Sequence, residues 1–167
     1  MRALGEKDIR ASFVNCSKGE ARRLTLPTGF AGTPWSDLDF LGWRDPKAPD
    51  RGYVVAERDD ALVGIALRAS AGARRSVLKS SICSVCVTPQ AGSGIALLVA
   101  PRAGEAGRQG NTVGLYICAD LACSLYVRGK KQSALARRME ESLTPQEQNE
   151  RTVRNLRGFL DQVLAGT

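Results

Sequence analysis

The sequence contains no histidine, and this absence excludes several kinds of active site. Histidine is the commonest general base at neutral pH and the commonest metal ligand in proteins. Mechanisms built on Ser-His-Asp or Cys-His are therefore excluded, and any metal must be held by cysteine, carboxylate or backbone groups. The chain also lacks a phosphate-binding glycine motif of the P-loop type and an evident pair of catalytic carboxylates. We expect a binding protein without a small-molecule substrate, not an enzyme.

Long hydrophobic runs are also missing from the sequence. No apolar stretch reaches the roughly 20 residues that a transmembrane helix requires. The first ten residues, MRALGEKDIR, mix acidic and basic side chains and lack the apolar segment of a secretory signal peptide. We therefore predict a cytoplasmic protein with no membrane partner, in a compartment where structural disulfides are rare.

The composition is that of a soluble globular domain with a basic surface. The 167 residues are 43% hydrophobic and 25% charged, and the net charge is +7 with a pI near 9.5. This charge favours an acidic partner, which can be RNA, DNA or an acidic protein surface, although a simple solvated surface is the alternative reading. The basic residues gather in three clusters: Arg68, Arg74, Arg75 and Lys79; Arg102 and Arg108; and Arg128, Lys130, Lys131, Arg137 and Arg138.

The hydrophobic pattern predicts an α+β fold, with an antiparallel β-sheet flanked by N- and C-terminal helices. We interpret residues 1–167 as a single zinc-binding domain: helix and ordered loop over 1–50, sheet and metal site over 51–128, and a C-terminal helix over 144–165. The predicted elements are a helix over 6–24, a loop with both tryptophans over 27–52, a hairpin of strands 52–58 and 62–68, a strand within 77–82, a buried strand over 94–101, a glycine-rich loop over 102–111, a strand over 112–117 and a short helix over 120–128.

Four of the five cysteines form two tight pairs, Cys83 with Cys86 and Cys118 with Cys123. The first pair has C-x2-C spacing and is expected in a knuckle between strands. The second has C-x4-C spacing and is expected at the end of a strand and in the first turn of a helix. This is the layout of a treble-clef site, in which four thiolates hold one zinc ion at about 2.3 Å. Four thiolates leave no open position for water, so the predicted Zn²⁺ is structural.

Three alternatives to a zinc site are also compatible with these cysteines. A redox C-x2-C pair does not explain the second pair. An iron–sulfur cluster uses the same ligands. Four buried cysteines without metal would be a coincidence of spacing.

Two further expectations concern the surroundings of this site. Four thiolates on one Zn²⁺ carry a net charge of −2, which Lys79, Arg128, Lys130 and Lys131 lie close enough in sequence to compensate. The fifth cysteine, Cys16, falls on the apolar face of the first predicted helix, where a small core residue is the expected role.

Five segments of the sequence resemble the FBP family. They are residues 11–20 (ASFVNCSKGE), 39–45 (DFLGWRD), 83–86 (CSVC), 110–123 (GNTVGLYICADLAC) and 127–131 (VRGKK). These short actinobacterial proteins are similar to the C-terminal treble-clef zinc-finger domain of elongation factor G-binding proteins of the FusB type, which confer fusidic acid resistance. The resemblance implies a cytoplasmic protein that binds elongation factor G and so acts on the translating ribosome. FusB-type proteins free the factor when the drug stalls it on the ribosome, and their zinc domain makes the main contact with the factor.

On this resemblance we predict a partner-binding surface near the zinc. It is expected to include Arg102, Arg108, Arg128, Lys130 and Lys131. The rival hypothesis is a zinc-ribbon-like protein that binds RNA or DNA directly, with ribosomal RNA as a candidate. The basic clusters are compatible with either partner.

Overall fold

The fold is built on a five-stranded antiparallel sheet with strand order β1-β2-β3-β6-β7. The computed structural model describes residues 1–70, 80–133, 135 and 141–165. The strands are β1 (Phe40–Arg44), β2 (Arg51–Arg58), β3 (Ala61–Ala69), β6 (Ile95–Pro101) and β7 (Thr112–Cys118). A small second sheet pairs β4 (Ser80–Ile82) with β5 (Pro89–Ala91). The predicted α+β class with an antiparallel sheet is confirmed.

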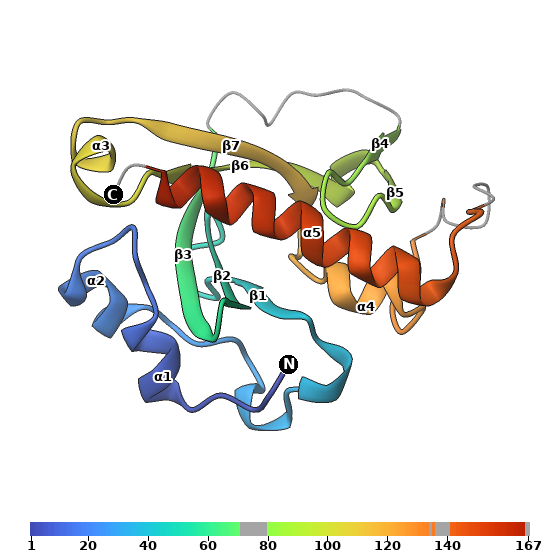
Figure 1. The fold of residues 1–167 in the computed structure, drawn as a ribbon, viewed down its shortest axis with the longest axis horizontal. Helices are drawn as coiled ribbons and strands as arrows, with labels where there is room; N and C mark the ends of the chain where they lie inside the picture. Colours follow the sequence, from blue (N-terminus) through green and yellow to red (C-terminus); the bar gives the residue numbers. More distant parts are fainter. Residues whose placement is uncertain (71–79, 134, 136–140, 166–167) are drawn as a thin grey trace.

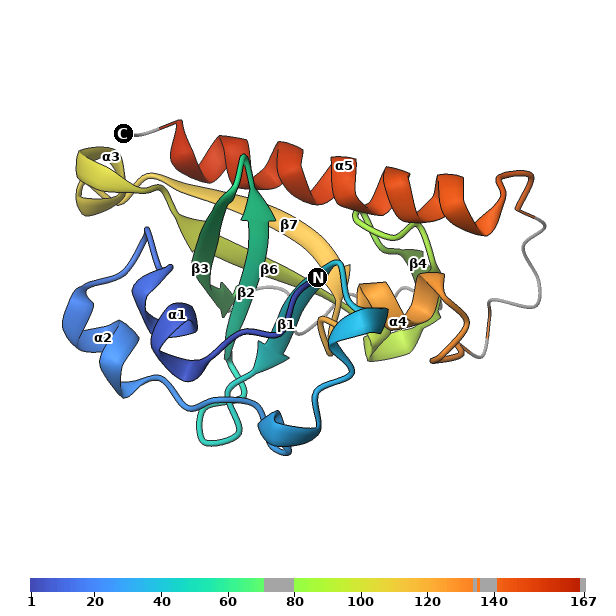
Figure 2. The same cartoon turned by 60° about the horizontal axis from the view of Figure 1, so that its bottom comes forward.

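Helices cover both faces of this sheet (Figures 1 and 2). They are α1 (Glu6–Ala11), α2 (Lys18–Arg23), α3 (Gly104–Arg108), α4 (Cys123–Val127) and α5 (Pro145–Leu164). Figure 2 shows α5 along one side of the sheet and α1 and α2 on the other. No helix in the described part of the chain combines the length and the apolar character needed to cross a membrane.

Two hydrophobic clusters lie on the two faces of the sheet. On one face, Leu156, Phe159, Leu160 and Val163 of α5 pack against buried residues of the strands, Val54 among them. On the other face, the N-terminal segment packs against the sheet through Leu4, Ile9, Trp43, Tyr53 and Val55. Successive residues of a strand point to opposite faces, so Val54 and Val55 belong to different clusters. Strand β2, which lies between β1 and β3, is therefore buried on both sides.

Several predicted elements are confirmed with small shifts of their ends. The hairpin of β2 and β3 turns through Asp59 and Asp60, whose φ angles of 48° and 64° match the two-residue turns that favour aspartate. Helix α5 begins at the predicted capping box, where the Thr144 hydroxyl accepts from the Glu147 amide and the Glu147 carboxylate accepts from the Thr144 amide. Of the strand expected within 77–82, only 80–82 falls in the described residues.

The single helix predicted over 6–24 is wrong, because the chain leaves helical geometry between α1 and α2. Phe13 forms a parallel bridge with Gly64 of β3. The Asn15 side chain donates to the backbone carbonyls of Ala66 and Pro101 and accepts from the Ala66 amide. These bonds to the sheet require an extended backbone, and Ser17 then caps a new helix.

Two predicted loops contain regular structure. The loop expected over 27–52 includes β1, which pairs with β2 along its whole length. Gly42 of β1 is required there, since an added Cβ would lie 2.6 Å from the carbonyl oxygen of Leu121. The glycine-rich loop expected over 102–111 contains α3. The expectation that both tryptophans pack on the core is confirmed, because Trp43 is buried in the second hydrophobic cluster and Trp35 packs against that cluster.

Candidate metal centre

The four predicted ligands, Cys83, Cys86, Cys118 and Cys123, form one buried cluster. Their sulfur atoms all lie within 4.8 Å of one another, and none of the four takes part in a disulfide. The Sγ–Sγ distance is 3.7 Å from Cys83 to Cys123 and 3.6 Å from Cys86 to Cys118. A tetrahedron of thiolates at about 2.3 Å from a zinc ion has sulfur–sulfur edges of about 3.8 Å. The donor set therefore fits a tetrahedral metal ion.

The surrounding elements bring the cysteines together as the spacing predicts. Cys83 directly follows β4, and the turn from Cys83 to Cys86 leads into β5. Cys118 ends β7 and Cys123 is the first residue of α4. The knuckle is fixed to β7 by a hydrogen bond of 2.8 Å from the Ser84 amide to the Tyr116 carbonyl. The two cysteine-bearing segments are thus held beside each other by backbone structure.

Polar N–H groups point at the sulfur atoms. The amides of Val85 and Cys86 each donate to the Cys83 sulfur at 3.4 Å. The buried side chain of Gln90 donates to the Cys118 sulfur at 3.8 Å. These donors place partial positive charge next to the thiolates and offset part of their negative charge.

The cationic side chains expected to compensate the thiolates pair with carboxylates instead. Arg128 binds Asp39, Lys131 binds Asp120 and Lys130 lies 3.7 Å from Asp37. The fourth expected cation, Lys79, lies outside the described residues. Compensation within the described part of the chain therefore comes from N–H donors at the sulfurs.

Without a metal, the four thiols share protons among themselves. Hydrogen bonds from Cys118 and Cys123 lower the pKa of the Cys83 thiol. The bonds that Cys123 makes with Cys118, Cys83 and Cys86, together with its burial, raise the pKa of Cys123 far above the ordinary value. A metal dication must displace these shared protons to bind, so its affinity depends on pH.

Two bulky residues in the cysteine loops have left-handed backbone geometry. Val87 follows the first pair with a φ of 59°, and Leu121 lies within the second pair with a φ of 60°. This geometry is rare for such residues and costs of order 1–3 kcal/mol each. A hydrogen bond of 2.9 Å from the Val87 amide to the Cys83 carbonyl holds Val87 in this geometry. Leu121 is held by its complete burial in the core.

The structure divides the five predicted partner contacts into three groups. Arg128 is largely buried and serves the fold, because its guanidinium bonds to Asp39 and Asn149. Lys130 and Lys131 lie near the cluster with about half of their side chains exposed. Arg102 precedes α3 and Arg108 is its last residue, at the end of the β6–β7 hairpin opposite to Cys118. Six residue steps of strand separate the two ends by about 20 Å.

Of the basic residues in the other predicted clusters, Arg68 lies on β3. The other members of those clusters, Arg74, Arg75, Lys79, Arg137 and Arg138, lie outside the described residues.

Two exposed apolar residues lie beside the knuckle and were not predicted as part of a site from the sequence. Ile82 and Tyr116 are 52% and 54% exposed, the only large hydrophobic side chains so exposed in the described part of the chain. Ile82 precedes Cys83, and the Tyr116 carbonyl holds the Ser84 amide. Strand alternation could have found Tyr116, because it neighbours the buried Ile117 and must point to the opposite face.

A family model described as the FBP C-terminal treble-clef zinc-finger matches residues 8–163. The chain belongs to this family. The resemblance seen in the sequence is thereby confirmed, as is the treble-clef arrangement of the four cysteines. A metal site of four cysteines is expected of an FBP zinc-finger.

A solved structure of the fusidic acid resistance protein FusC has a similar fold, with a TM-score of 0.53 and 19% sequence identity. The similarity covers 85% of this chain and 52% of FusC, so this chain spans about half the length of FusC. No curated protein matches the sequence.

Proposed function

We propose that the chain binds one structural Zn²⁺ and, in that form, binds elongation factor G and thereby acts on the translating ribosome in the cytoplasm. The observation that carries this proposal is the family match over residues 8–163 together with the intact four-cysteine cluster. The fold similarity to FusC, a fusidic acid resistance protein, supports it. The proposed activity is binding, not catalysis.

The geometry of the sulfurs favours zinc over the alternatives. All four lie within 4.8 Å of one another, as around a single ion. An iron–sulfur cluster of two or four irons places inorganic sulfide between its metals and holds its cysteines farther apart. A redox pair would use only two of the cysteines. The ion would hold the two cysteine loops together and leave no coordination position for water.

The proposed contact surface lies beside the metal centre. It consists of the exposed apolar side chains Ile82 and Tyr116 and the exposed lysines Lys130 and Lys131. Exposed apolar groups beside charged residues are typical of protein-binding surfaces. We expect the lysines to accelerate association with an acidic factor. Arg102 and Arg108 remain predicted contacts, but a partner must span about 20 Å to reach them as well.

A pull-down from a bacterial lysate, run with and without ribonuclease, tests the proposal. Elongation factor G should be captured in both cases and identified by mass spectrometry. Lys130→Glu with Lys131→Glu should reduce capture, whereas Arg154→Glu with Arg157→Glu should not. This control makes the same charge change at two exposed positions of α5.

Direct nucleic-acid binding is the second candidate, favoured by the net charge of +7. It predicts that capture of the factor disappears after ribonuclease treatment. It also predicts retention on ribosomes stripped of factors, with an affinity that falls steeply with salt as counterions are released. Either result would favour direct binding to RNA over binding to elongation factor G.

A further inference from the structure

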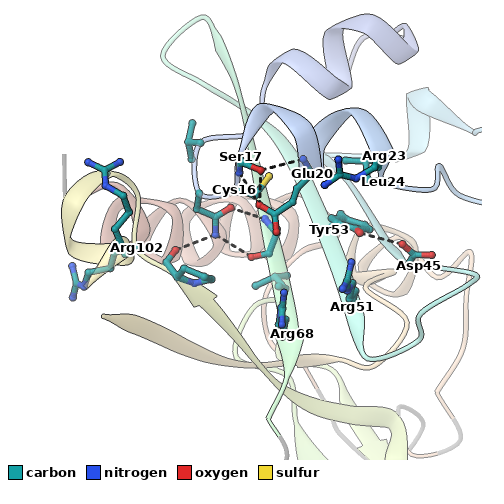
Figure 3. Close-up of a pocket in the computed structure, with 18 residues that line it drawn as sticks. Cys16, Ser17, Glu20, Arg23, Leu24, Asp45, Arg51, Tyr53, Arg68 and Arg102 are labelled. Atoms are coloured by element: carbon teal, nitrogen blue, oxygen red, sulfur yellow. Dashed lines mark hydrogen bonds between the residues drawn. The ribbon is translucent and has the colours of Figure 1, made fainter. Parts of the chain in front are cut away.

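A cavity of about 770 Å³ lies on the face of the sheet that carries the N-terminal segment. Its walls come from β2 and β3, from the segment between α1 and α2, and from α2 and α3 (Figure 3). Cavities of this size accommodate small-molecule ligands. Its most unusual feature is its arginine content: Arg23, Arg51, Arg68, Arg102 and Arg108 all line it.

Two of these arginines face each other across neighbouring strands. Arg51 of β2 and Arg68 of β3 are direct partners in the strand register. Figure 3 shows their side chains side by side. Like charges in directly opposite positions of a sheet destabilise it. Neither residue, nor Arg23 of α2, forms an ion pair within 4.0 Å of any described carboxylate. Their partners are the Glu20 carboxylate, which interacts electrostatically with Arg68 and Arg23, and the Tyr53 side chain, which interacts with Arg51.

The two carboxylates of the cavity are already bonded to other groups. Glu20 accepts hydrogen bonds from the amide and the hydroxyl of Ser17, at 2.9 and 2.8 Å. Asp45 accepts from the Lys47 amide at 2.9 Å and from the Tyr53 hydroxyl at 3.1 Å. Five arginines and two carboxylates line the cavity, and one of the arginines, Arg108, is paired with Glu105, so an excess of positive charge remains.

The two arginines at the α3 side of the cavity, Arg102 and Arg108, are held in place by other residues of the protein. The Arg102 guanidinium donates to the Gln162 carbonyl at 2.8 Å, which joins it to α5. Arg108 forms an ion pair of 2.7 Å with Glu105, one turn earlier in α3. The cavity therefore combines three arginines without a short ion pair, on the sheet and α2, with two arginines whose guanidinium groups are engaged by α5 and by Glu105.

We infer that this cavity binds a small ligand that carries phosphate groups. A guanidinium presents parallel N–H donors that match two oxygens of one phosphate, and two adjacent guanidinium groups match a dianion. A bound phosphate removes the repulsion between Arg51 and Arg68. The cavity is also lined by Val14, Leu24 and the Tyr53 ring, which offer apolar contact for an organic part of the ligand. A hollow of limited volume suits a small molecule better than a nucleic-acid strand.

Calorimetric titration of the metal-loaded full chain with pyrophosphate tests the inference. We expect saturable binding of one pyrophosphate per chain. Arg51→Gln with Arg68→Gln should weaken binding at least tenfold, and Arg51→Lys with Arg68→Lys should weaken it less, because charge remains but the planar donors are lost. The control Arg154→Gln with Arg157→Gln removes the same charge from exposed positions of α5 and should change the affinity less than twofold.

A thermal melt separates loss of binding from loss of fold. Pyrophosphate should raise the melting temperature of the natural chain but not that of Arg51→Gln with Arg68→Gln. Without ligand this variant should melt no lower than the natural chain, because it removes a like-charge pair, and its metal content should be unchanged.

Three results would overturn the inference. The first is an absence of saturable pyrophosphate binding by the natural chain. The second is equal weakening by the α5 control, which would show that general electrostatic attraction accounts for the binding. The third is binding of citrate as tight as that of pyrophosphate, which would show that the site does not select phosphate.

Discussion

The Arg128 guanidinium and the Asp39 carboxylate form two parallel hydrogen bonds of 2.6 and 2.8 Å. Arg128 follows α4, the helix that carries the last cysteine, and Asp39 directly precedes β1. Asn149 of α5 completes the group, because it accepts from Arg128 at 2.8 Å and donates to Asp39 at 3.1 Å. The hydrogen bonds with Asp39 raise the pKa of Arg128 above its ordinary value. This ion pair and its Asn149 partner thus connect the segment after α4 to β1 and to the C-terminal helix α5.

Breaking this pair should destabilise the fold. Arg128→Met leaves the Asp39 carboxylate, which is only 14% exposed, without its charged partner, and we expect a loss of about 2–3 kcal/mol in the free energy of unfolding. The matched change Lys130→Met affects an exposed pair and should cost less than about 1 kcal/mol. Urea unfolding followed by tryptophan fluorescence measures both. Equal stability of the two variants would show that Arg128 contributes no more than a surface charge.

Removing one metal ligand should remove the metal and much of the stability. Elemental analysis of the purified protein should find close to one zinc per chain and no iron. Cys83→Ser or Cys118→Ser should abolish that content and cost several kcal/mol, because the binding energy of a structural zinc is folding energy. A folded, metal-free protein with five titratable thiols would contradict the zinc site.

Cys16 should behave differently from the other four cysteines. It lies in the segment between α1 and α2, half-buried at the wall of the arginine-lined cavity, and not on a helix as the sequence suggested. Burial, and then the charge of Glu20, raise the pKa of its thiol to about 11. Cys16→Ala should keep the metal content and cost about 1 kcal/mol or less. Loss of metal in this variant would show that the ligand set is wrong.

Metal affinity should fall as the pH is lowered. The ligands bind as thiolates, and in the metal-free cluster the pKa of Cys123 is raised far above its ordinary value by shared hydrogen bonds and burial. Each proton that returns to sulfur competes with the metal, so affinity is highest at alkaline pH and decreases through neutral to acidic pH. Competition with a coloured zinc chelator, at several pH values between about 5 and 8, measures the trend. An affinity independent of pH would mean that the ligands are not thiols in the free protein.

The sequence allowed the metal centre to be predicted because its signal is local. The two short cysteine spacings place their sulfurs through knuckle and strand-to-helix geometry, whatever the rest of the chain does. The capping box of Ser17 and Glu20 was visible as well, and it could have divided the helix predicted over 6–24. The break between the two helices, however, is caused by the pairing of Phe13 with Gly64. This is a contact between distant segments of the chain, which a local sequence pattern does not contain.

Placement of the basic residues could not be predicted, because it depends on the length and register of the β6–β7 hairpin. Arg102 and Arg128 are close in sequence to different ends of that hairpin, which lie about 20 Å apart. The pairing of Arg51 with Arg68 likewise follows from the strand register. Arg68 was therefore grouped from the sequence with the basic residues that follow it, and Arg51 was not singled out.

Calorimetric titration of the zinc-loaded chain with purified elongation factor G, free of RNA, measures the proposed interaction itself. We expect saturable binding that weakens with salt, since screening slows the association of oppositely charged surfaces. Lys130→Glu with Lys131→Glu should weaken it while zinc content and melting temperature stay nearly unchanged. No measurable binding at about 50 µM of each protein, together with tight binding to bare ribosomal RNA, would contradict the account.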